Sequence, residues 1–203
     1  MYNKLKFLQV VFFLIISYSS VAKAHLDAPP PQRIKYDLLS KNNNIEIRKY
    51  SKSIILELDV KSNLKKSFSE GTYVIGGFLQ GRNSAFKKIE PTMLPIFATK
   101  NINDTLSIDI NSEGWKVFFF IPETYQVNDV PQSENKDIRI THFKESKIVA
   151  IKIKSLDREE INKKLGTLKI FLSNQNLAAK KIMITQYKEG FFSGSYEILV
   201  LVD

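Results

Sequence analysis

The sequence predicts an α+β domain, a distorted β-barrel made of two ββαββ repeats (about 45–121 and 138–202) with two helices packed on it. Three observations lead to this fold class. Residues 43–62 recur 93 positions later without a gap, the apolar residues of both passages alternate as in half-buried strands, and helical spacing follows each passage. Because one unit of this size would bury its apolar sheet face poorly, both units should form one domain.

The repeat extends well beyond its first passage. When the sequence is aligned with itself at the same shift of 93 positions, apolar residues align with apolar residues and several short polar segments are identical or similar. Two such units could join edges, close a curved sheet and hide the open edges of each unit. The matched positions include Ile45 with Ile138, Ile47 with Ile140, Tyr50 with Phe143, Phe78-Leu79 with Phe171-Leu172, and Lys87-Lys88-Ile89 with Lys180-Lys181-Ile182.

The N-terminus has the features of a secretory signal peptide. Lys4 and Lys6 precede an apolar run at 7–16, and Ala22-Lys23-Ala24 supplies an A-x-A cleavage site. The alternative interpretation is a buried N-terminal helix. Removing 24 residues from 203 leaves 179, which suits one domain. The expected organisation is a signal peptide at 1–24, an extended Pro-rich lead at 25–35 and a single domain at 36–203.

Each copy should contain two strands, a helix and two more strands. In the first copy the opening strands are 45–47 and 54–60, with a turn at Ser51-Lys52. The closing strands lie near 93–99 and 115–122 in the first copy and near 181–187 and 196–202 in the second. Residues 101–114 could hold one more short strand, and 122–136 form the seam between the copies. The helices are marked by apolar faces: Phe68, Ile75, Phe78 and Leu79, then Ile161, Leu165, Leu168, Phe171 and Leu172.

The amino-acid composition excludes several classes of function. The chain has no cysteine, which excludes disulfides, thiol chemistry and Cys-based metal sites. Its formal charge of +9 falls to +6 when the three lysines of 1–24 are removed, and this excess either favours anionic partners or is an ordinary solvated surface. Export makes nucleic acid an unexpected partner. The sequence contains no nucleophile elbow, HExxH motif or Gly-rich phosphate loop, so we expect a protein that is not an enzyme.

Five segments in the same order carry a family resemblance. They are Tyr36 with Ile45-Glu46-Ile47-Arg48-Lys49-Tyr50, then 78–83, 88–96, 117–122 and 127–131. Together they resemble the motifs of the SOUL, or p22 haem-binding-protein, family over about residues 33–203. The family's C-terminal R-N-E-V is replaced here by Gly194-Ser195-Tyr196-Glu197-Ile198. The resemblance implies a barrel of two ββαββ repeats and a tetrapyrrole, haem or porphyrin, lying against the first helix in a mostly apolar groove.

The resemblance also suggests residues for this groove. The family's haem-facing helix positions correspond here to Ser69, Thr72, Gly76 and Gly77, beside the apolar Phe68. Two interpretations stay open: the glycines let a flat macrocycle approach the helix backbone closely, or the sequence drifted after binding was lost. Lys65 and Arg82 flank the helix and are candidates to pair with haem propionates.

Candidate metal ligands are few. His142, Met93 and Tyr73 are possible axial ligands of haem iron, but the pattern favours an ordinary surface histidine for His142 and core residues for the other two. After cleavage behind Ala24, the amine and imidazole of His25 could chelate Cu²⁺.

Glu46 and Arg48 share one face of the first strand, because residues two apart in a strand point the same way. They could hydrogen-bond a ligand or form a structural ion pair that closes one end of the barrel.

The sequence therefore predicts an exported, periplasmic or secreted, monomeric binding protein for haem or a related tetrapyrrole, without stable membrane insertion after cleavage. One alternative is the same barrel binding another apolar or cationic small molecule without haem. Another is an interaction protein that presents its Pro-rich lead or a sheet edge.

Overall fold

The computed structural model of the chain describes residues 36–89, 96–101, 106–189 and 193–203. All of them belong to the compact unit Gln32–Asp203. The predicted signal peptide (1–24), the Pro-rich lead (25–35), His25 and Met93 lie outside the described residues.

The described residues form strands, two α-helices and one 3-10 turn in an order close to the prediction. The strands are β1 (Tyr36–Asn42), β2 (Ile45–Tyr50), β3 (Ser53–Val60), β4 (Ile96–Asn101), β5 (Trp115–Phe120), β6 (Arg139–Phe143), β7 (Ser146–Ile153), β8 (Ala179–Glu189) and β9 (Ser193–Val202). The helices are α2 (Leu64–Leu79) and α3 (Arg158–Asn174), and the 3-10 turn is η1 (Val127–Asp129). Neither helix is long and apolar enough to span a membrane.

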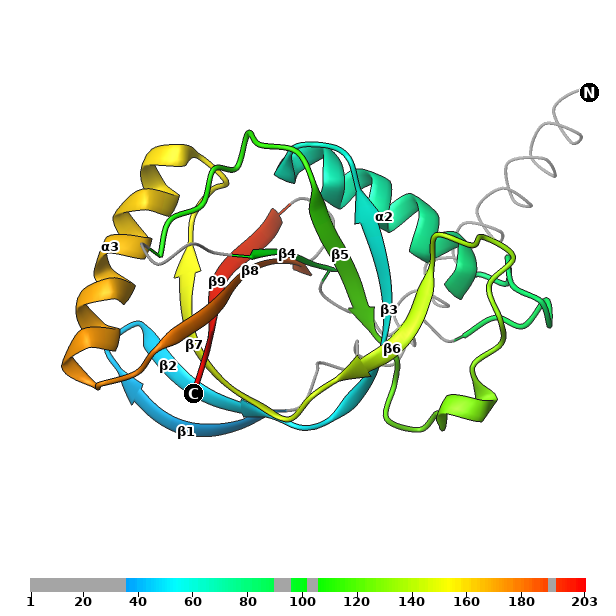
Figure 1. Ribbon diagram of the computed structural model, residues 1–203, viewed down its shortest axis with the longest axis horizontal. Helices are drawn as coiled ribbons and strands as arrows, with labels where there is room; N and C mark the ends of the chain where they lie inside the picture. The colour runs from blue at the N-terminus through cyan, green and yellow to red at the C-terminus, as the bar shows by residue number, and fades with distance from the viewer. Residues whose placement is uncertain (1–35, 90–95, 102–105, 190–192) are drawn as a thin grey trace, which may run out of the picture. The chain divides into compact units, whose positions relative to one another are not determined.

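The strands belong to one antiparallel sheet in the order β1-β2-β7-β9-β8-β4-β5-β3-β6 (Figure 1). This confirms the predicted α+β class. The pairing order ends at β1 and β6, and among the described residues no strand pair joins these two edges. The hydrogen-bonded sheet is therefore open, and the barrel stays a prediction.

Strands of one predicted copy pair with strands of the other at three places in this order. The elements run β2-β3-α2-β4-β5 and then β6-β7-α3-β8-β9, and the pairs β2–β7, β3–β6 and β4–β8 join one run to the other. Tyr50 lies opposite Ser146 in the first pair, and Phe143 lies opposite Ser53 in the second. Phe143 lies 93 positions after Tyr50, and Ser53 lies 93 positions before Ser146. The shift of 93 positions therefore converts the first residue pair into the second, so the β2–β7 and β3–β6 ladders have the same register.

The strand β1 was not predicted, and its sequence explains why. All seven of its residues are exposed, so their pattern lacks the alternation that marks a half-buried strand. A weaker signal was present in the asparagines that follow it. Asn43 has a φ of 53° in the turn that leads to β2, a conformation that asparagine tolerates better than most residues. The predicted extra strand is not found in residues 106–114, the part of that segment which follows the undescribed 102–105.

The helix α2 begins and ends at residues that stabilise its two termini. The side chain of Asn63 accepts a hydrogen bond of 3.0 Å from the backbone N–H of Lys66, which is N-capping. At the other end Gly81 has a φ of 104°, and the N–H groups of Gly81 and Arg82 donate to the carbonyls of Phe78 and Gly77. This Schellman arrangement favours glycine and terminates the helix.

Both faces of the sheet are buried over much of its width. One face packs against the helices, and the predicted apolar positions of α2 and α3 are buried there, apart from the half-buried Phe171. Figure 1 shows α2 beside β3 and β5, and α3 beside β7. The other face carries an aromatic cluster in which the rings of Phe97 and Phe118 stack at 5.0 Å and Phe120 packs edge-on against both.

Candidate functional site

The predicted haem-binding residues lie on different sides of α2. Lys65, Ser69 and Thr72 are exposed, and Gly76 is half-buried on the same side of the helix. A Cβ built on Gly76 would meet nothing within 4 Å, so the space above it is open. Phe68, in contrast, is 3 % exposed and belongs to the core beneath the helix. The sequence therefore brings four of its candidate residues together on one accessible helix face.

Arg82 covers the remaining glycine of the prediction. A Cβ on Gly77 would lie 1.9 Å from a guanidinium nitrogen of Arg82, so only glycine lets this side chain cross the helix. The guanidinium donates to the backbone carbonyl of Tyr73 at 3.1 Å and lies 5.0 Å from the centre of the Tyr73 ring. Gly77 thus serves the docking of Arg82, and Tyr73, which is 70 % exposed, joins the open face of α2.

The segment after α2, which carries one of the family-like motifs, is organised by Asn83. This side chain is fully buried, and its amide nitrogen donates to the carbonyls of Phe78 and Lys87 at 2.9 and 2.7 Å. Its amide oxygen accepts from the N–H groups of Ala85 and Lys87. The motif therefore holds the helix end and the following loop in one conformation.

His142 lies on β6, away from the exposed face of α2. It is exposed and lines a pocket of about 290 Å³ together with Lys52, Glu123 and Tyr125. The helix α2 packs on β3, β4 and β5, so His142 is not brought to that helix face. Within the described ranges, no group of three or more His, Asp or Glu side chains is placed to hold a metal ion.

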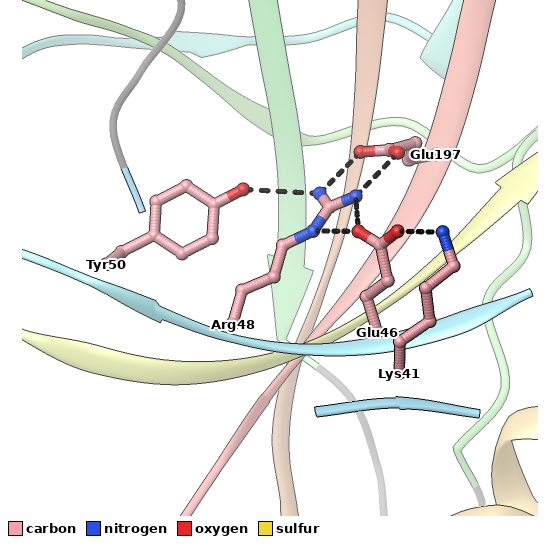
Figure 2. A network of polar contacts seen from close by, with 5 residues as sticks. All are labelled: Lys41, Glu46, Arg48, Tyr50 and Glu197. Atoms are coloured by element: carbon pink, nitrogen blue, oxygen red, sulfur yellow. Dashed lines mark hydrogen bonds and ion pairs between the residues drawn. The ribbon is translucent and has the colours of Figure 1, made fainter. Parts of the chain in front are cut away.

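The predicted Glu46–Arg48 pair is the centre of a larger buried network (Figure 2). The guanidinium of Arg48 donates two hydrogen bonds to Glu197 at 2.7 and 2.9 Å, and two more to Glu46 at 2.7 and 2.9 Å. It also lies 3.4 Å from the Tyr50 hydroxyl and 4.5 Å from the centre of the Tyr36 ring. This network connects β1 and β2 with β9, at the other end of the chain.

The network keeps Arg48 and Glu46 charged. Burial alone would lower the pKa of Arg48 and raise that of Glu46. The hydrogen bonds outweigh this effect, so Glu197 and Glu46 hold the pKa of Arg48 above its usual value. In the same way Arg48 and Lys41 hold the pKa of Glu46 below its usual value. Burial raises the pKa of Tyr50 to about 12, so its hydroxyl stays protonated.

This geometry favours the structural interpretation of the Glu46–Arg48 pair. Arg48 is 4 % exposed and its guanidinium is bound on two edges by carboxylates, which leaves little capacity for a ligand. Sequence reasoning missed Glu197, because 149 positions separate it from Arg48 and no local pattern links them. Beside it, the hydroxyl of Thr185 is buried without a hydrogen-bond partner, although Thr185 lies opposite Glu197 in the sheet.

These observations define a class of protein. Its described residues form an α+β domain with a nine-stranded, mostly antiparallel sheet, two helices on one face and an accessible surface on α2. The family described as SOUL heme-binding protein matches residues 31–200, and the chain belongs to this family. No curated protein matches the chain.

Solved structures show the same fold at low identity. A hydrolase from Listeria innocua is 10 % identical with a TM-score of 0.56, covering 81 % of this chain and 94 % of that one. The C-terminal domain of EcmrR is 9 % identical with a TM-score of 0.58, covering 83 % of this chain and 98 % of that one. At these identities the likeness concerns the fold alone.

Proposed function

We propose that this protein is an exported, non-catalytic haem-binding protein that holds the tetrapyrrole against the exposed face of α2. The observation that carries the proposal is membership of the SOUL heme-binding protein family over residues 31–200. The open, small-residue face formed by Ser69, Thr72 and Gly76 supports the location.

The surface of α2 suits a flat ligand. Side chains at Ser69, Thr72 and Gly76 are short, so a planar ring can approach the helix closely and replace water over it. Lys65, near one end of this face, is exposed and forms no ion pair with a carboxylate within the described part of the chain. Its ammonium group can therefore pair with a propionate.

Tyr73 is the candidate iron ligand that the fold brings to this face. It is exposed, and it stands one helical turn from Ser69 and from Gly76. A tyrosine oxygen is an established axial ligand of haem iron. The Arg82 guanidinium, 5.0 Å from the Tyr73 ring, helps to fix that ring and contributes positive charge near it.

Titration with hemin tests the proposal. We expect a saturable change of the Soret band at one haem per chain, and a flat titration would remove the proposal. Gly76→Trp should block the face and abolish the change, because the space above Gly76 is open in the wild type. Gly166→Trp is the matched control, since Gly166 also faces open space but on the other helix. Equal titrations for both variants would contradict the location.

Tyr73→Phe examines the iron ligand separately from binding. This change removes the phenol oxygen and keeps the ring. We expect haem to remain bound with an altered absorption spectrum, while an unchanged spectrum would exclude Tyr73 as ligand.

The proposal includes export of a monomer after cleavage behind Ala24, supported by the charged, apolar and small-residue segments of 1–24. N-terminal sequencing of the exported protein should begin at His25.

The proposal also includes descent from one duplicated ββαββ unit and a barrel-like closure of the sheet. The shared register of β2–β7 and β3–β6 under a shift of 93 positions supports the duplication.

A further inference from the structure

A second pocket lies where β3 and β4 end and where β5 and β8 begin. It has a volume of about 430 Å³, within the range of about 300–1,000 Å³ typical of small-molecule sites. No residue of the exposed α2 face contributes to it. Its lining consists of Asp59, Val60, Lys61, Thr99, Gly114, Trp115, Lys116 and Lys181.

The floor of this pocket is mostly apolar. Val60 and Trp115 are buried, at 4 % and 1 % exposed. The polar groups of the floor are already bonded, since the indole N–H of Trp115 donates to the carbonyl of Ser112 at 2.9 Å. In the same way the hydroxyl of Thr99 donates to the carbonyl of Ile182 at 2.9 Å. An apolar ligand body can therefore lie on this floor without leaving a donor unpaired.

Part of the charge around the pocket is balanced by the protein itself. Lys116 contacts Glu57 at 2.6 Å and Asp59 at 3.4 Å, and Arg139 contacts the same two carboxylates at 3.0 and 2.6 Å. Arg139 and Lys116 hold the pKa of Asp59 below its usual value, so this acid stays charged and paired. These four residues, two acidic and two basic, form a neutral group.

Lys61 and Lys181 differ from Lys116 and Arg139 in their charge partners. Within the described residues, neither has a carboxylate partner, yet both line the pocket. Lys61 is exposed and Lys181 is half-buried, so their ammonium groups can meet a ligand from the solvent side. The site thus combines an apolar floor with two positive charges that no carboxylate among the described residues neutralises.

We propose that this pocket binds an organic carboxylate with an apolar body, and that Lys61 and Lys181 pair with the carboxylate while the body lies on Val60 and Trp115. This is a second site, separate from the helix face on which haem binding is proposed. Its ligand is a smaller amphipathic anion, because a cation would be repelled and a fully polar anion would gain nothing from the floor.

Trp115 makes the test direct, because it is the only tryptophan in the chain. The purified protein is titrated with decanoate below its micelle concentration, and the emission of Trp115 is recorded. We expect a saturable change with decanoate, weaker binding at high salt, and little or no binding of 1-decanol, which has the same chain without the charge. A flat titration with decanoate, or equal binding of 1-decanol, would overturn the proposal.

Substitutions test whether Lys61 and Lys181 bind the carboxylate. Lys61→Gln combined with Lys181→Gln should raise the Kd of decanoate roughly tenfold, as expected for losing two partly exposed charge contacts. The matched control is Lys163→Gln combined with Lys169→Gln, which removes two exposed charges from α3 and should leave the Kd unchanged. An unchanged Kd in the first variant, or an equal rise in the control, would show that the lysines do not hold the ligand.

The two proposed sites can fail independently. Lys61→Gln with Lys181→Gln should leave the hemin titration unchanged. Gly76→Trp should leave the Kd of decanoate unchanged, measured by titration calorimetry because this variant carries a second tryptophan. Loss of decanoate binding in Gly76→Trp would contradict two separate sites. A flat hemin titration with normal decanoate binding would remove only the haem proposal.

Discussion

Arg48 shows how one residue can connect distant parts of the sheet. It is buried, and four of its hydrogen bonds go to Glu46 and Glu197. Burying an ion pair is costly, and the pair stabilises the fold only while each charge keeps its partner. Removing the guanidinium therefore takes two hydrogen bonds away from Glu197, whose side chain is 5 % exposed.

Arg48→Met should lower the free energy of unfolding by about 3–5 kcal/mol, measured by urea denaturation. Adding Glu197→Leu should restore much of the loss, because the buried carboxylate that Arg48 paired with is then gone as well. Lys49→Met is the control on the neighbouring position. Lys49 forms an exposed ion pair with Glu145, so its replacement should change stability by less than about 1 kcal/mol. A double variant less stable than Arg48→Met would contradict this account.

The lowered pKa of Glu46 predicts how the contribution of this network to folding stability depends on pH. Its folded-state pKa lies below the unfolded value of about 4.3, so its contribution is complete above that pH and is lost as pH falls through the folded pKa. The stability difference between the wild type and Glu46→Gln should therefore be largest at neutral pH and should shrink in acid. Urea unfolding at several pH values from 7 to below 4 measures it. A constant difference would exclude this role for Glu46.

At the scale of elements, α2 combines a buried packing face with an exposed face that is poor for helix stability. Gly76 lies inside the helix, where glycine is less stable than alanine, and no contact in the described structure requires it. Gly81, after the helix end, is different, because its φ of 104° is strained for any other residue. The two glycines should therefore respond in opposite ways to the same substitution.

Gly76→Ala should raise the free energy of unfolding by about 0.5–1 kcal/mol, and Gly81→Ala should lower it by about 1–2 kcal/mol. Thermal or urea unfolding without ligand measures both. Gly166→Ala, in the exposed part of α3, is a control that should stabilise like Gly76→Ala. If Gly76→Ala destabilises while Gly166→Ala stabilises, then Gly76 has a structural role that its open surroundings do not reveal.

At the scale of the whole described domain, the sheet depends on pairing between distant segments. The pairs β2–β7, β3–β6 and β4–β8 each join one half of the chain to the other. The Arg48–Glu197 contact does the same. Neither half forms its full part of the sheet without the other, so the halves should fold together.

A fragment of residues 36–131 should therefore show no cooperative unfolding by itself, and neither should 132–203. Mixing the two fragments should restore β-sheet circular dichroism and a cooperative transition, because strand edges and apolar faces become covered. A cooperative transition in either isolated fragment would contradict this interdependence.

The sequence by itself determined the local elements and the family. Periodicity depends on which side of a strand or helix is buried, so alternation predicted β2, β3 and β7, and helical spacing predicted the buried faces of α2 and α3. The resemblance of five motifs likewise identified the family that matches residues 31–200. The resemblance also pointed to the helix positions proposed for haem, of which Ser69, Thr72 and Gly76 lie on one accessible face.

Only the tertiary structure decided which distant residues meet. Glu197 reaches Arg48, and Lys181 joins Lys61 at one pocket, because the strands that carry them are brought together by the order of the sheet. The exposed β1 has no buried side to create a pattern, and Arg82 covers Gly77 through a fold-back after the helix. The spacing of apolar residues within a segment shows which side of that segment is buried. Contacts between residues far apart in the chain depend on strand order and register, which cannot be deduced from any short segment of sequence.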